Sequence, residues 1–72
     1  MTENELAEIC KKCINKKIKI IFNNNNIATG RFFDFTWAAD NDPEIASIAI
    51  EDKTGQLHGY LQSEIESIEV LE

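Results

Sequence analysis

Residues 27–38 read IATGRFFDFTWA and predict a long β-strand. The stretch is rich in β-branched and aromatic residues, which favour strands. Positions two apart lie on the same face of a strand, so an inward face that holds Phe33, Phe35 and Trp37 leaves Phe32 pointing outward. An outward phenylalanine would contribute to an apolar patch of the kind that partner proteins cover.

A bend is predicted within this strand, and a hairpin before it. Gly30 lies inside the strand, where glycine usually marks a bulge or a sharp bend. The segment 17–22 begins with alternating polar and apolar side chains, and this alternation predicts a half-buried strand. Four asparagines at 23–26 separate the two strands, and asparagine tolerates the left-handed conformation that tight hairpins need. The two strands are therefore expected to pair antiparallel.

An amphipathic helix is predicted upstream, over residues 2–15. Thr2 and Glu5 have the capping-box spacing, in which a hydroxyl and a carboxylate each accept a backbone N–H at the helix start. Glutamates stand near the beginning and lysines near the end, which suits the helix dipole. Apolar residues recur every three or four positions and predict one buried stripe, made of Leu6, Ile9, Cys10, Cys13 and Ile14.

Three shorter strands are predicted downstream, joined by turns of hairpin length. Such short connections link antiparallel neighbours. With a core this small, the sheet is expected to bend strongly or to curl into a small barrel. The predicted fold class is mainly β, with an N-terminal α-helix followed by a five-stranded, strongly bent antiparallel sheet or small barrel in a single domain, residues 1–72. The three later strands are expected at residues 45–51, 56–62 and 66–71, with a short connector at 63–65.

Charge is distributed unevenly along the chain, whose formal net charge is −6 at pH 7. Residues 1–19 hold five lysines and three glutamates, a net of +2, whereas residues 20–72 hold two basic residues and ten carboxylates, a net of −8. An acidic body repels phosphates, so RNA binding is possible but disfavoured. Any such binding would use the N-terminal lysines, which are Lys11, Lys12, Lys16, Lys17 and Lys19.

The composition predicts a cytoplasmic protein. Two cysteines are too few for the disulfide framework of a small secreted domain, which favours a reducing compartment. The first 17 residues lack the apolar stretch of a signal peptide, and the longest apolar runs are too short to span a membrane. No membrane association is therefore expected.

The sequence contains no catalytic constellation, and no cofactor or metal is expected. Cys10 and Cys13 form a CxxC pair, which could be a redox pair or half of a zinc site. Redox motifs of this kind follow a strand in a βαβ unit, which is absent here, so the preferred interpretation is two small apolar residues on the helix stripe. His58 is the only histidine, and a catalytic base needs a nucleophile and an orienting group. The chain is therefore predicted not to be an enzyme.

The order of elements resembles the Sm-like small barrel, the fold of the Sm and Hfq proteins, over nearly the whole chain. A helix precedes the first strand, residues 30–35 resemble the bent second strand, and residues 63–71 resemble the short turn and final strand. The resemblance implies RNA contacts in the loops after the second and fourth strands. Thr36 stands about where the family has an aspartate, and residues 62–64 replace its arginine-glycine contact. The residues therefore match the family's fold and not its RNA contacts.

Together these features predict a non-enzymatic Sm-like interaction module that self-associates, with another protein as a possible partner. The family closes its sheet edges by pairing the fourth strand of one subunit with the fifth strand of the next. Two alternatives are an RNA-binding protein that uses the N-terminal lysines, and a metal or redox protein centred on the two cysteines. The residues expected to make the self-association contacts are His58, Tyr60, Leu61, Ile68 and Val70.

Overall fold

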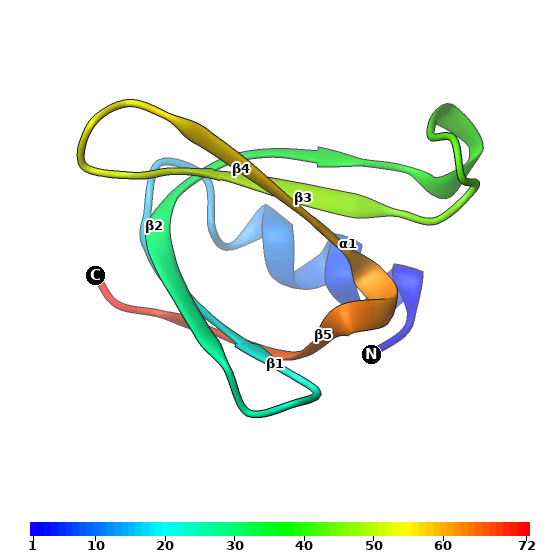
Figure 1. Ribbon diagram of the computed structural model, residues 1–72, viewed down its shortest axis with the longest axis horizontal. Helices are drawn as coiled ribbons and strands as arrows, with labels where there is room; N and C mark the ends of the chain where they lie inside the picture. The colour runs from blue at the N-terminus through cyan, green and yellow to red at the C-terminus, as the bar shows by residue number, and fades with distance from the viewer.

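The computed structural model describes all 72 residues and contains one helix followed by five antiparallel strands in a single sheet (Figure 1). This confirms the predicted fold class. The elements are α1 (Glu3–Lys11), β1 (Lys17–Phe22), β2 (Ile27–Thr36), the short 3-10 helix η1 (Ala38–Asp40), β3 (Ser47–Glu51), β4 (Leu57–Leu61), the short 3-10 helix η2 (Gln62–Glu64) and β5 (Ile65–Val70).

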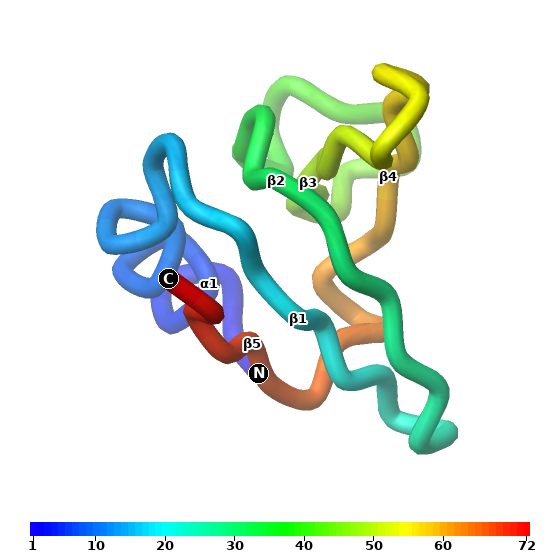
Figure 2. The backbone as a smooth tube through the Cα atoms, turned by 90° about the vertical axis from the view of Figure 1, so that its left-hand side faces the viewer, coloured from blue at the N-terminus to red at the C-terminus, as the bar shows by residue number.

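The sheet has the strand order β4-β3-β2-β1-β5 and bends along β2. The first half of β2 pairs with β1, the second half pairs with β3, and Arg31 is the residue at which the partner changes. The sheet therefore has two arms, β3–β4 and β1–β5, which diverge from β2 (Figure 2). Because β4 and β5 do not pair with each other, the result is an open, strongly bent sheet and not a closed barrel.

The two faces of β2 differ from the prediction. The pairing of β2 with β3 shifts by one residue between Phe32 and Asp34, so Phe33 is a β-bulge. A bulge reverses the alternation of faces, and Phe32 before it and Phe35 after it both pack on the core. Phe33 is 57% exposed and Trp37 is 48% exposed. The expectation of an outward Phe32 with Phe33 and Trp37 inside is wrong, because strict alternation does not continue through a bulge.

Gly30 lies directly before the residue at which β2 changes partner, as its place in the sequence predicts for a bend. A Cβ atom at this position would lie 2.8 Å from the carbonyl oxygen of Glu51 and 3.1 Å from Cδ1 of Ile50. The missing side chain therefore lets β3 approach β2 closely where the sheet turns.

The helix α1 begins where the sequence predicts and ends earlier. Oγ1 of Thr2 accepts the N–H of Glu5 at 3.1 Å, and Oε1 of Glu5 accepts the N–H of Thr2 at 2.7 Å, which completes the capping box. The predicted end at residue 15 is wrong, because the regular helix stops at Lys11 and the turns that follow end with Asn15 at φ +61°. Ile14, the last residue of the predicted stripe, is therefore 61% exposed.

The core lies where α1 packs against the bent sheet, and Figure 1 shows the helix between the two arms in that view. A second register shift, between β1 and β5, allows both Ile65 and Ile68 to face this core. The fully packed cluster consists of aliphatic side chains and the two cysteines, and it draws on the helix and its following turn, β1, β3 and β5: Leu6, Cys10, Cys13, Ile18, Ile20, Ile48, Ile50 and Ile65.

Candidate interaction surfaces

The strands β4 and β5 form the two edges of the sheet. β4 pairs only with β3, and β5 pairs only with β1. An edge strand presents a row of unpaired N–H and C=O groups on its free side, which can pair with another chain. All the residues predicted to mediate self-association lie on these two strands, with His58, Tyr60 and Leu61 on β4 and Ile68 and Val70 on β5.

The side chains of these residues differ in their availability. The ring of Tyr60 packs edge-to-face on Phe22 with 4.9 Å between ring centroids, and Ile68 packs on the core. Val70 is 41% exposed, because it ends the last strand outside the packed cluster. Leu57, which the sequence analysis did not select, is 48% exposed at the start of β4. Apolar surface at the edges therefore comes mainly from the strand ends.

His58 belongs to a hydrogen-bonded turn. Its Nε2 lies 2.7 Å from Oδ2 of Asp52, across the turn between β3 and β4. The other carboxylate oxygen of Asp52 accepts the N–H and hydroxyl of Thr54 and the N–H of Gln56. The hydrogen bond from His58, and to a smaller extent those from Thr54, hold the pKa of the Asp52 carboxyl group well below its usual range. His58 therefore orders the end of the β3–β4 hairpin.

Two of the five N-terminal lysines are paired with carboxylates. Lys11 forms an ion pair with Glu8 at 3.0 Å, and Lys19 forms one with Glu69 at 2.9 Å. Such exposed pairs contribute little to stability, but they lower the local positive charge. The exposed lysines without an ion pair are Lys12, Lys16 and Lys17.

The fold places Lys17 beside two basic residues that are distant in sequence, Arg31 and Lys53. The three line a cleft of about 550 Å³, which they share with the carboxylates of Glu51 and Asp52. Arg31 is also held by the Asn15 carbonyl and by Glu72, at 2.6 and 3.2 Å. Because both acidic and basic side chains line this cleft, it offers no uniformly positive surface to a phosphate backbone.

Both cysteines face the core, as the helix stripe predicts. Cys10 is 5% exposed and Cys13 is fully buried, and Sγ of Cys13 lies 3.2 Å from the carbonyl oxygen of Ile9. Burial raises the pKa of Cys10 to about 12 and raises that of Cys13 as well. No group of three histidine, cysteine, aspartate or glutamate side chains is arranged to hold a metal ion. A buried thiol with a raised pKa is a poor nucleophile and a poor metal ligand.

An exposed apolar groove of about 210 Å³ runs between α1 and the second half of β2. Ile14 and Trp37 lie on its walls, and both are largely exposed. Trp37 contacts Phe35 edge-to-face with 5.0 Å between ring centroids. No pattern in the sequence predicts this groove, because it depends on the early end of the helix and on the bulge in β2.

No family model, no curated protein and no solved structure matches this chain. None of its helices is long and apolar enough to cross a membrane.

Proposed function

We propose that this protein is a non-enzymatic Sm-like interaction module that self-associates through its two sheet edges. The observation that carries the proposal is that one small sheet leaves one side of both β4 and β5 unpaired, with exposed apolar residues at the ends of these strands. An open edge is a ready template for another strand. A domain of this size also has a marginal core, which favours burial of further surface in an oligomer.

Three features of the chain support the Sm-like part of the proposal. A helix precedes β1, the second strand is long and bends near Gly30, and only the short turn η2 separates β4 from β5. These are the features by which the sequence resembles the Sm-like family. In that family the fourth strand of one subunit pairs with the fifth strand of the next.

The charges on the edges favour the pairing of β4 with β5 of another copy. β4 has the sequence LHGYL and carries no carboxylate, whereas β5 carries Glu66 and Glu69. Pairing β5 with a second β5 would bring like charges together, which is unfavourable on neighbouring strands. A contact between two different edges is heterologous, so it forms a ring if the rotation closes and a filament if it does not.

Sedimentation velocity at moderate salt over a wide range of protein concentration tests this proposal. We expect species heavier than a monomer, and Leu57→Lys should shift them toward the monomer because a lysine blunts an edge strand. Ile27→Lys is the matched control, because Ile27 is similarly exposed, at 59%, on a strand that is not an edge. A single monomer-sized species at every concentration would refute self-association.

RNA binding through the N-terminal lysines is the second candidate function. It is favoured by the three exposed lysines that have no ion pair, Lys12, Lys16 and Lys17. It is opposed by the two loops in which the family binds RNA. There Asn41 donates to the carbonyl of Ile45, and the carboxylates of Asp42 and Glu64 line the same shallow cleft. A salt titration of single-stranded RNA binding separates the candidates, because phosphate contacts give a steep dependence on salt.

The buried thiols suit a reducing compartment, and we propose a cytoplasmic location for the protein.

Another protein could also occupy the free edges of β4 and β5, and co-purification from cells with the Leu57→Lys variant as a comparison would identify it.

A further inference from the structure

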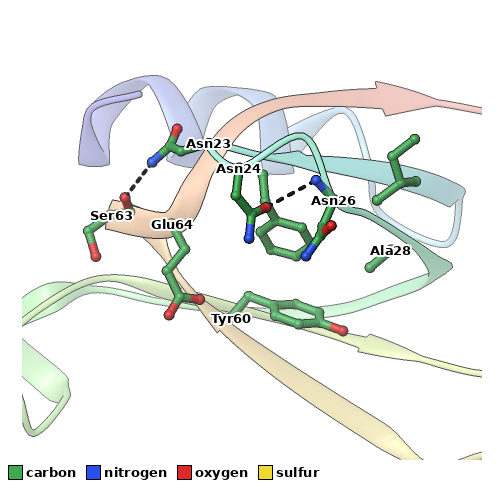
Figure 3. Close-up of a pocket in the computed structure, with 9 residues that line it drawn as sticks. Asn23, Asn24, Asn26, Ala28, Tyr60, Ser63 and Glu64 are labelled. Carbon is green, nitrogen blue, oxygen red and sulfur yellow. Dashed lines mark hydrogen bonds between the residues drawn. The ribbon is translucent and has the colours of Figure 1, made fainter.

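The largest cleft of the molecule lies between the β1–β2 hairpin and the end of β4 with η2 (Figure 3). Its volume is about 710 Å³, which is within the usual range for small-molecule and side-chain binding sites. Figure 3 shows Tyr60 on one side, Asn24 and Asn26 on the facing side, and Glu64 at one end. The cleft therefore lies between residues of the two arms of the sheet.

Contacts between distant parts of the chain hold the walls of this cleft in place. Nδ2 of Asn23 donates to the carbonyl of Ser63 at 2.8 Å, and the N–H of Asn23 donates to the carbonyl of Glu64 at 3.0 Å. The ring of Phe22 supports the ring of Tyr60 from β1. The hairpin and η2 are thus fixed relative to each other, so the cleft is largely formed before any ligand arrives.

The lining offers hydrogen-bond acceptors and an aromatic ring, and it offers no positive charge. None of its nine residues is lysine, arginine or histidine. The carboxylate of Glu64 forms no ion pair, and the side-chain amide of Asn26 forms no hydrogen bond within the chain. The surrounding body is acidic, with a net charge of −8 over residues 20–72. The site therefore attracts a cation and repels an anion.

We propose that this cleft binds the guanidinium group of an arginine side chain presented by a partner protein. A guanidinium is planar, carries five N–H donors and no acceptor, and stacks on aromatic rings. Its donors complement the carboxylate of Glu64 and the amide oxygen of Asn26, and its planar face complements the aromatic ring of Tyr60, which lines the same cleft. A lysine ammonium lacks the planar shape and fits the space between Tyr60 and the two asparagines less well.

This proposal does not depend on self-association. Pairing of β4 with another strand uses the backbone of its free side, whereas the ring of Tyr60 already packs toward Phe22 and the cleft. The partner would be a protein segment with an exposed arginine, for which the acidic body supplies long-range attraction.

The test is a titration of isotope-labelled full-length protein with N-acetyl-arginine amide, followed by two-dimensional NMR. We expect saturable shifts centred on Asn26, Tyr60 and Glu64, with a dissociation constant on the order of millimolar for so small a probe. The citrulline analogue has nearly the same shape without the charge and should bind at least about tenfold more weakly, because charge-assisted hydrogen bonds are the stronger ones.

Two variants and two further probes complete the experiment. Glu64→Gln should weaken binding about tenfold without disturbing the fold, because Glu64 is exposed, and Glu44→Gln is the matched control on an exposed turn outside the cleft. Equal binding of the citrulline analogue, unchanged binding by Glu64→Gln, or shifts spread evenly over the surface would each overturn the proposal. Tighter binding of butylguanidinium, which carries the same single charge, than of the peptide-like probe would show that the occupant is a free guanidinium compound and not a protein segment. N-acetyl-lysine amide should bind more weakly than the arginine probe, and equal affinity would refute the planar fit.

Discussion

Replacement of Gly30 by alanine is the sharpest test of how the sheet bends. The added methyl group would lie 2.8 Å from the carbonyl oxygen of Glu51, which is backbone and cannot rotate away. It would also meet Cδ1 and Cβ of Ile50 at 3.1 and 3.3 Å, and Ile50 is a fully packed core residue. The methyl group can therefore be accommodated only if β3 moves away from β2 at the point where the sheet turns.

The expected cost follows from two opposing effects. Extra methyl groups in a well-packed region destabilise by about 1–3 kcal/mol. Alanine also restricts the unfolded chain relative to glycine, which raises the free energy of unfolding by about 0.4–1 kcal/mol. We expect a net loss of about 1–2 kcal/mol for Gly30→Ala, which for a domain of this size lowers the melting temperature by roughly 5–15 °C.

Gly59→Ala is the matched control, because it makes the same chemical change on β4. The nearest atom to a Cβ at position 59 is the carbonyl oxygen of Ile48 at 3.9 Å, an ordinary contact distance. Gly59→Ala should be neutral or stabilising by up to about 1 kcal/mol. Both variants can be compared by urea and thermal unfolding at one protein concentration. Equal stability of the two variants would refute the close approach of β3 to Gly30.

Three other predictions concern the helix cap, the β3–β4 turn and the thiols. Thr2→Ala removes one half of the capping box and should cost about 0.5–2 kcal/mol in urea unfolding, whereas an unchanged midpoint would contradict the cap. Asp52 has a lowered pKa in the folded protein, so its contribution to stability is present above its unfolded pKa, near 3.8, and is lost as pH falls further. The Asp52→Asn variant should therefore lose less stability than the wild type between neutral and strongly acidic pH, and parallel pH profiles would exclude this role. Cys10 and Cys13 should react with a thiol reagent only as fast as the protein opens, because both are buried, and stoichiometric labelling within the mixing time would show that they are accessible.

Features encoded by neighbouring residues could be predicted from the sequence, and features created by distant pairing could not. The start of α1 was predictable because Thr2 and Glu5 form a local hydrogen-bonded motif. The end of α1 was not, since the apolar spacing continues through Cys13 and Ile14, beyond the last helical residue Lys11. The presence and approximate limits of the strands follow from alternation and turn residues. The bulge at Phe33 is a property of how β2 pairs with β3, and alternation within β2 alone cannot locate it.

The same distinction applies to the candidate sites. The free edge of β4 does not follow from the hairpin-length connections, because these predict that β4 and β5 are neighbours, whereas β5 pairs with β1. The cleft at Tyr60 does not follow from the sequence either, because its walls come from residues 22–28 and 60–64, which the fold brings together. A signal was present in the four consecutive asparagines, because the side chain of Asn23 tethers the hairpin to Ser63 and the side chain of Asn24 accepts a backbone N–H within the turn.

The pairing of β1 with β5 sets the order in which the sheet can form. The hairpins β1–β2, β2–β3 and β3–β4 each join neighbours in sequence, whereas β1 and β5 pair residues 18–22 with residues 65–70. Closing so long a loop is entropically expensive until the chain between has already become compact, so β5 joins after the three hairpins. Until it does, both β1 and β4 are bare edges, and the half-assembled sheet is the species most exposed to wrong pairing with other chains. Substitutions in β5 should then act mainly on the unfolding rate, because its contacts are absent from the transition state for folding.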